Sequence, residues 1–133
     1  MRTIVVARAG IVAALVLVTG CSKPAEPVKI TALVLGGKIN DDKSISSMQE
    51  TFAPSSTVYG AISTEGSGQA TLAARWTAAD GRVLAEQTQV INPTRASHFE
   101  FHLAPDGGWP VGRHKVVFTL NGTAGRTREF EIR

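Results

Sequence analysis

The run Ser97–Leu103, S-H-F-E-F-H-L, alternates polar and apolar side chains from His98 to its last residue. Its two phenylalanines and its leucine fall on one face of an extended chain, and its two histidines and its glutamate fall on the other. Strict alternation of this kind predicts a β-strand with one face in a hydrophobic core and the other in water. The rest of the fold can be inferred outward from this strand.

Further segments carry the same alternation, or the apolar and β-branched composition that is typical of strands. They are Ile30–Leu35, Val58–Ile62, Thr71–Trp76, Val116–Leu120 and Phe130–Ile132. Turn-forming residues separate the segments about once in every ten residues, which is typical of a β-sandwich. The sequence therefore predicts an all-β fold, a single antiparallel β-sandwich of about seven to eight strands.

Two dipeptides indicate tight hairpins between these strands. Asp80-Gly81 precedes Val83, and Asn121-Gly122 follows Leu120. Both dipeptides tolerate the positive φ angles that a two-residue hairpin turn needs. The second one predicts a C-terminal hairpin, with strands from about Arg113 to Leu120 and from Gly125 to Ile132.

The segment Ser44–Phe52 is ambiguous. Ile45, Met48 and Phe52 could share one face of a short helix that begins after Asp41, Asp42 or Ser44. The same residues could also form an irregular strand. Serine and threonine lower helix propensity because their side chains compete for backbone hydrogen bonds. We therefore favour a strand over a helix here.

The first 20 residues have the layout of an export signal. Arg2 and Arg8 supply a basic start, and the ten-residue run Ala9–Val18 is apolar. This run is too short to span a bilayer, which takes about 20 apolar residues. Such a layout is typical of a secretory signal peptide. An ordinary leader without lipid attachment, or an uncleaved anchor, is the alternative interpretation.

The run Leu17-Val18-Thr19-Gly20-Cys21 resembles the lipobox of bacterial lipoproteins. The resemblance implies cleavage before Cys21, diacylglycerol on its sulfur and an acyl chain such as palmitate on its amine. Ser22 at the next position, rather than Asp, implies sorting to the outer membrane, facing the periplasm. No cofactor other than this covalent lipid is expected.

The predicted organisation has three parts. Residues 1–20 form the cleaved signal peptide, residues 21–29 form the lipidated cysteine with a flexible tether, and residues 30–133 form the sandwich. Removing Arg2 and Arg8 leaves 12 basic and 11 acidic residues, so the mature chain is nearly neutral. No basic stripe with interleaved aromatic residues occurs, and nucleic acid is therefore not expected as a partner. With Cys21 as the one cysteine, the chain has no internal disulfide.

Several stretches of the domain resemble a group of small, uncharacterised bacterial envelope lipoproteins with an immunoglobulin-like sandwich. They are Phe52–Tyr59, Ala74–Trp76, Gly108–Val116 and Leu120–Gly122, together with Asp80-Gly81 and Phe130. The resemblance implies an immunoglobulin-like fold and no defined activity. His114 stands where such domains often carry a tyrosine that ties a corner loop to the backbone. A ring nitrogen of His114 could make the same tie, or the corner could be looser.

No catalytic residues are expected. The chain has three histidines and no G-x-S-x-G motif, and its one acidic pair, Asp41-Asp42, would point to opposite faces of a strand. His98, Glu100 and His102 share a strand face and are weak candidates for metal ligands. The two histidines lie about 13 Å apart at about 3.3 Å per residue, so one strand cannot bring both to one ion. We expect a solvated polar face and no metal.

Trp76 is expected in the core. Trp109 precedes a proline in a glycine-rich loop, and we expect it to close one end of the core, with an exposed binding contact as the alternative. The leading functional hypothesis is a lipid-anchored, non-enzymatic envelope protein that binds another envelope protein or serves in a complex. The alternatives are an inhibitor of an envelope hydrolase, with Trp109 and His114 at its binding surface, and a periplasmic module that binds a small ligand or a metal.

Overall fold

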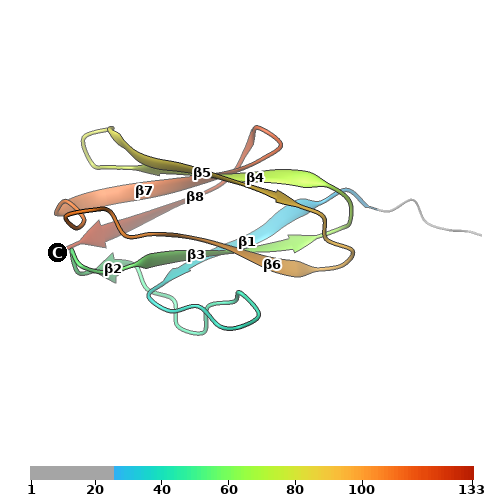
Figure 1. The fold of residues 1–133 in the computed structure, drawn as a ribbon, viewed down its shortest axis with the longest axis horizontal. Helices are drawn as coiled ribbons and strands as arrows, with labels where there is room; N and C mark the ends of the chain where they lie inside the picture. Colours follow the sequence, from blue (N-terminus) through green and yellow to red (C-terminus); the bar gives the residue numbers. More distant parts are fainter. Residues whose placement is uncertain (1–25) are drawn as a thin grey trace, which may run out of the picture.

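The computed structural model describes residues 26–133, except the side chain of Ala124. The described residues form eight β-strands and no helix (Figure 1). None of them therefore forms a helix that could cross a membrane. The strands are β1 (Lys29–Gly36), β2 (Thr51–Phe52), β3 (Val58–Glu65), β4 (Ala70–Thr77), β5 (Val83–Ile91), β6 (Ser97–Leu103), β7 (Gly112–Leu120) and β8 (Thr123–Ile132).

The strands form two sheets that pack face to face, as Figure 1 shows. The smaller sheet has the order β1-β3-β6, and the larger one has the order β2-β8-β7-β4-β5. This is the predicted all-β sandwich, with eight strands. One pairing departs from the antiparallel prediction, because the short strand β2 runs parallel to β8.

The strand Ser97–Leu103 is confirmed over its full predicted length as β6. The C-terminal hairpin is also confirmed, with Asn121 at φ 51° and Gly122 at φ 80° in a two-residue turn. The prediction of a two-residue turn at Asp80-Gly81 is wrong. The chain there forms a longer loop, 78–82, closed by a hydrogen bond from the N–H of Ala78 to the carbonyl of Arg82.

The strand that we favoured over Ser44–Phe52 forms only at its last two residues, as β2. The rest is a loop, which polar side chains hold together. The amide of Asn40 donates to the hydroxyls of Ser44 and Ser46, and Asp42 accepts from both the N–H and the hydroxyl of Ser44. These side-chain bonds replace the backbone ladder that a strand would need.

The domain begins earlier than residue 30. The N–H of Ser67 donates to the carbonyl of Glu26 at 2.9 Å, and Val28 packs against the core. A Cβ at Gly66, which has φ 88°, would collide with the carbonyl of Pro27. Glu26–Lys29, predicted as part of a flexible tether, is therefore docked on the loop between β3 and β4.

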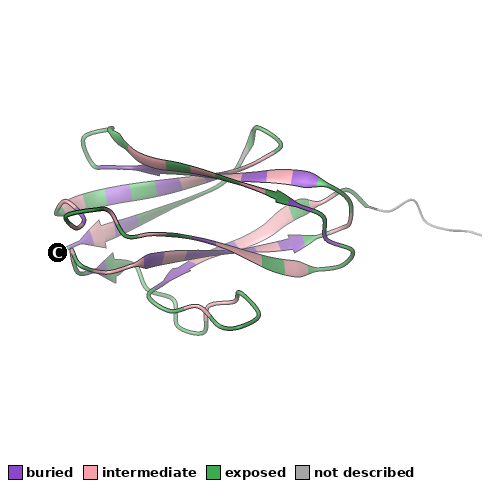
Figure 2. Ribbon diagram, in the orientation of Figure 1, coloured by how far each residue is buried: buried purple, intermediate pink, exposed green. Residues whose placement is uncertain are grey.

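The core lies between the two sheets, and Figure 2 shows buried and exposed residues alternating along several strands. Trp76 is fully buried, as predicted. Within residues 26–133, every buried side-chain nitrogen or oxygen has a hydrogen-bond partner. The largest fully buried side chains are Trp76, Phe118, Phe130, Leu33, Ile62, Leu72, Ile132 and His114.

Candidate functional site

The two ends of the sandwich differ in what they carry. At one end, called here the tether end, Glu26 contacts the 66–69 loop, and Gly68 donates to the carbonyl of Pro93. The 121–122 turn lies at the same end, because Asn121 bonds to Thr71 at the start of β4. The opposite, far end carries the loops 53–57, 78–82 and 104–111. Figure 1 shows the chain entering at the tether end and finishing at the far end.

Trp109 closes the far end of the core. Its side chain is 3% exposed, and its ring lies edge-on against Phe130 at 5.2 Å between centroids. Its indole N–H donates to the carbonyl of Ser56 at 2.8 Å, and its backbone N–H donates to the carbonyl of Pro54. The prediction of a core plug is confirmed, and the ring is not an exposed contact. A hydrolase inhibitor that works through the ring of Trp109 does not fit this burial.

His114 ties two loops of the far end to the core, which is one of the two alternatives left open by the sequence. It is 2% exposed. Its Nδ1 accepts from the backbone N–H of Ala79 at 3.1 Å, and its Nε2 lies 2.5 Å from the carbonyl of Pro110. A carbonyl only accepts, so Nε2 carries the proton and the ring is the neutral tautomer. Both nitrogens are therefore occupied by backbone groups, and His114 has no free nitrogen for a ligand.

His98, Glu100 and His102 lie on the solvent face of β6, as predicted, but they do not converge. His102 Nδ1 contacts Glu100 Oε2 at 3.0 Å, whereas His98 Nδ1 bonds to the hydroxyl of Ser63 on β3 at 3.0 Å. Among the described residues, no three histidine, cysteine, aspartate or glutamate side chains are grouped as a metal site would need.

Ser63 and His98 have the spacing of a nucleophile and its base. A catalytic triad also needs a group that orients the base and a place for the substrate. Within residues 26–133, no carboxylate hydrogen-bonds to His98. The carboxylate of Asp42 cannot be counted as this third group, because it already accepts two hydrogen bonds from Ser44. The hydrogen bonds from Ser44 hold the pKa of Asp42 below its usual value. This pair therefore lacks the third member of a triad.

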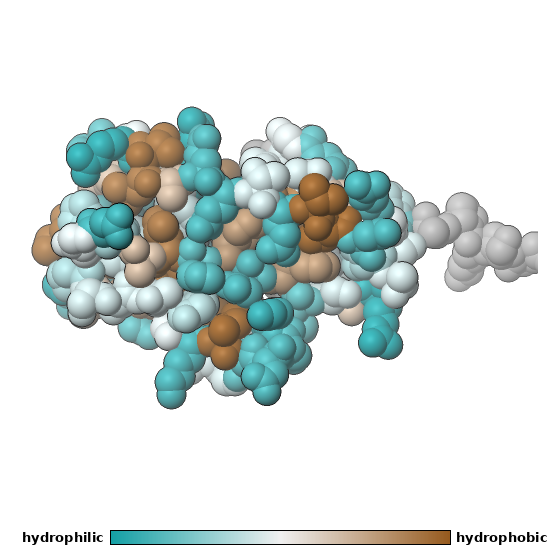
Figure 3. All heavy atoms as spheres, viewed as in Figure 1, coloured by the Kyte–Doolittle hydropathy of each residue, from teal (hydrophilic) through white to brown (hydrophobic). Residues whose placement is uncertain are grey.

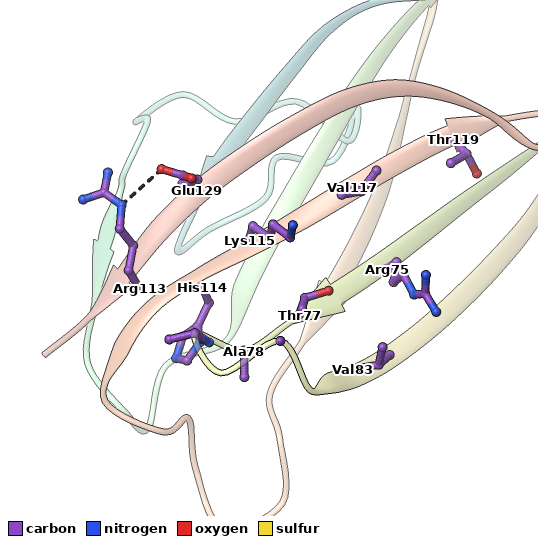
Figure 4. Close-up of a pocket in the computed structure, with 12 residues that line it drawn as sticks. Arg75, Thr77, Ala78, Val83, Arg113, His114, Lys115, Val117, Thr119 and Glu129 are labelled. Atoms are coloured by element: carbon purple, nitrogen blue, oxygen red, sulfur yellow. Dashed lines mark hydrogen bonds and ion pairs between the residues drawn. The ribbon is translucent and has the colours of Figure 1, made fainter.

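A shallow concavity of about 650 Å³ lies on the outer face of the larger sheet, toward the far end (Figure 4). Two of its cations are paired, Arg113 with Glu129 at 3.1 Å and Arg75 with Glu86 at 2.9 Å. Lys115 lies between them, with no carboxylate of the described residues within ion-pair distance. The surface is open and, with Lys115 unpaired among the described residues, slightly positive, so it lacks the enclosure of a small-ligand pocket.

Side chains close one edge of the smaller sheet in a way that the sequence analysis missed. Gln87 and Gln89 lie on the core-facing side of β5, and their amides donate to the carbonyls of His102 and Glu100 on β6. Gln87 also accepts from the buried indole of Trp76 at 2.9 Å. These glutamines stand at positions where an alternating strand normally has apolar residues.

The other edge of the smaller sheet is closed by two arginines. Arg126 and Arg128 of β8 donate to the carbonyls of Thr31 and Leu33 on β1, at 3.0 and 3.1 Å. Both arginines are in phase with Phe130 along the strand, which was the available signal in the sequence. Both edges of the smaller sheet are therefore covered by side chains of the larger sheet.

No protein-family model matches the chain, and no curated protein matches it. Solved structures match its fold. The alkylpurine DNA glycosylase AlkC of Pseudomonas fluorescens aligns over 80% of this chain and 30% of its own, with a TM-score of 0.54 and 15% identity. A β-glucosidase of Listeria innocua aligns over 81% and 16%, with a TM-score of 0.51 and 13% identity. At these identities the similarity shows a shared sandwich fold alone.

The predicted lipidation site, Cys21, and the leader before it lie outside the described residues.

Proposed function

We propose that this chain is a lipid-anchored, non-enzymatic protein of the bacterial cell envelope, and that its sandwich serves as a protein-binding or accessory module. The observation that carries the proposal is the run Leu17-Val18-Thr19-Gly20-Cys21 behind a basic and apolar leader. With Ser22 after the cysteine, the anchor belongs in the outer membrane and the domain in the periplasm.

The position of the tether supports this arrangement. Four residues, 22–25, separate the lipidated cysteine from the docked Glu26, so residues 21–25 form the tether. At about 3.5 Å per residue they span at most about 17 Å. The 66–69, 92–96 and 121–122 loops then face the membrane, and the far end, with Val111 72% exposed, faces away from it. Two acyl chains give stable anchoring.

The proposal of a binding module without catalysis rests on how the polar side chains are used. Both nitrogens of His114 are occupied by backbone groups. The indole N–H of Trp76 donates to the side-chain oxygen of Gln87, and the side-chain amide of Gln87 donates to the backbone of β6. These groups hold the fold, which leaves the strand edges and loops of a rigid sandwich as recognition surfaces.

Radioactive palmitate labelling and membrane fractionation test the anchor. The wild-type chain should incorporate label and sediment with outer membranes. A Cys21→Ala chain should lose the label, and Ser22→Ala serves as the matched control that keeps the cysteine. A wild-type chain that is unlabelled, or a Cys21→Ala chain that keeps its label, contradicts the proposal.

A further inference from the structure

The outer edge of β5 is a long strand edge without a neighbouring strand among the described residues. Both edges of the smaller sheet are covered by side chains of the larger sheet, as described above. At one margin of the larger sheet, β2 pairs only with Glu131 and Ile132 of β8, and the rest of β8 carries a bulge and the two arginines that bind β1. At the opposite margin β5 pairs only with β4, and no residue within 26–133 bonds to the backbone of β5 from its other side. A strand of nine residues, Val83–Ile91, is thus left open.

The sequence of β5 has few of the features that keep strand edges apart, and its one bulge lies at its start, at Leu84, so that Ala85–Ile91 pairs regularly with β4. Edge strands are usually protected by lysine, proline, bulges or inward charges. The run V-L-A-E-Q-T-Q-V-I has no lysine and no proline, and its one charged residue, Glu86, is already paired with Arg75 at 2.9 Å. Val90, near the end of this strand, is 62% exposed. On the face displayed in Figure 3, hydrophobic residues form separate patches.

We propose that the free edge of β5 binds an extended segment of another envelope protein, which adds a sixth strand to the larger sheet. Backbone groups along the edge supply the affinity in strand addition, and alternate side chains supply the selectivity. The added strand places every second side chain beside Glu86, Thr88 and Val90. A segment rich in β-branched or hydroxyl side chains, without an acidic residue opposite Glu86, fits this edge.

A second copy of this chain is a poorer occupant. Two identical edges pair symmetrically only when the strands run antiparallel, which points the two tether ends in opposite directions. A nine-residue strand spans about 30 Å, whereas residues 21–25 reach about 17 Å. With the tether end facing the membrane, as proposed above, two such copies could not both be anchored in one membrane. The choice of another protein as the occupant rests on the proposed lipid anchor. The finding that the edge of β5 is open does not depend on the anchor.

Photo-crosslinking in cells tests the inference on the full-length anchored protein. The crosslinking residue p-benzoylphenylalanine replaces Thr88 or Val90 on the edge strand. In the matched control it replaces Thr119, on the outer face of the central strand β7. The two edge probes should crosslink to one and the same protein, at positions two residues apart in a single extended segment. The control probe should not reach that segment.

An edge-blocking variant completes the test. Thr88→Pro removes a backbone N–H and should reduce the crosslink from position 90 about tenfold, the effect of losing one or two hydrogen bonds. If the proline variant is too unstable, Val90→Lys replaces it as the edge-blocking variant, and the crosslink is then measured from the probe at position 88. Thr119→Lys is the control for Val90→Lys.

Three outcomes overturn the inference: no crosslink at either edge position, crosslinks without the two-residue step, or crosslinks between two copies of a lipidated chain. Palmitate labelling of the same cells separates these outcomes from a failure of the anchor. If the chain is unlabelled and crosslinks to itself, the anchor and the choice of occupant fail together.

Discussion

The indole N–H of Trp76 donates to Oε1 of Gln87 at 2.9 Å, in the core at the margin between the two sheets. The same amide donates through Nε2 to the carbonyl of His102 at 2.8 Å. One side chain thus satisfies a buried donor of the larger sheet and covers the edge of the smaller one.

Gln87→Leu keeps the volume of this side chain and removes both bonds. A buried donor left without an acceptor costs about 1–3 kcal/mol, so the free energy of unfolding should fall by that amount. Urea unfolding followed by tryptophan fluorescence measures it. Thr88→Val, on the exposed side of the same strand, is the control. Equal stability of the two variants would show that the bridge does not contribute.

Arg128 makes a related contribution at the opposite margin, through its bond to the carbonyl of Leu33. Arg128→Met keeps the aliphatic stem but removes the donor, and at this partly solvated site the hydrogen bond contributes about 0.5–1.5 kcal/mol. Arg75→Met is the matched control, because an exposed ion pair contributes about 0.2–1 kcal/mol. Thermal unfolding should therefore shift further for Arg128→Met. A larger shift for Arg75→Met would contradict this account of the closed edge.

Trp109 should behave as a core residue. Trp109→Ala removes a ring that packs on Phe130, and large-to-small changes of this kind cost about 3–5 kcal/mol. Val111→Ala, in the same loop but 72% exposed, should change stability by less than about 0.5 kcal/mol. If Trp109→Ala unfolds at the wild-type denaturant concentration, the ring does not plug the core.

His114 should be found as the neutral Nε2–H tautomer. Its Nδ1 must accept from Ala79 while its Nε2 donates to Pro110. Nitrogen chemical shifts of the imidazole at neutral pH distinguish the two tautomers directly. His114→Phe keeps a ring but leaves both backbone groups unpaired, and it should lower the melting temperature. A proton on Nδ1 would refute the arrangement.

Asp42 gives a prediction about pH in the 40–46 loop. Hydrogen bonds from Ser44 hold its pKa below the usual value of 3.8. The contribution of these bonds to stability is therefore present above that value and is lost as the pH falls through the lowered pKa. Ser44→Ala should raise the pKa of Asp42 in an NMR titration. Ser46→Ala, which does not touch Asp42, should leave it unchanged, and equal titration of Asp42 in both variants would contradict the assignment.

The alternating strands could be predicted from the sequence because their apolar residues face one core. Ser97–Leu103 and the Asn121-Gly122 hairpin are the clearest cases. Strand β5 had a weaker signal, because Gln87 and Gln89 occupy its core-facing positions. The 37–50 loop gave a false strand signal, because its ordered shape depends on side-chain bonds that no periodic pattern records.

The candidate site was harder to predict than the fold. Burial decides whether Trp109 is a plug or a contact, and burial depends on the loop 53–57, which is distant in sequence. The sequence left open whether His114 makes a tie or the corner is looser, because its two partners are backbone groups that no side-chain pattern reveals. The open edge of β5 follows from strand order, which the sequence did not specify.

The central claim is that Cys21 is the lipidated first residue of the mature chain. Mass spectrometry of the N-terminal peptide of the protein extracted from membranes tests it most directly. The account predicts a peptide that begins at Cys21 and carries diacylglycerol on sulfur and an acyl chain on its amine. A peptide that begins elsewhere, or one that begins at an unmodified Cys21, would contradict it.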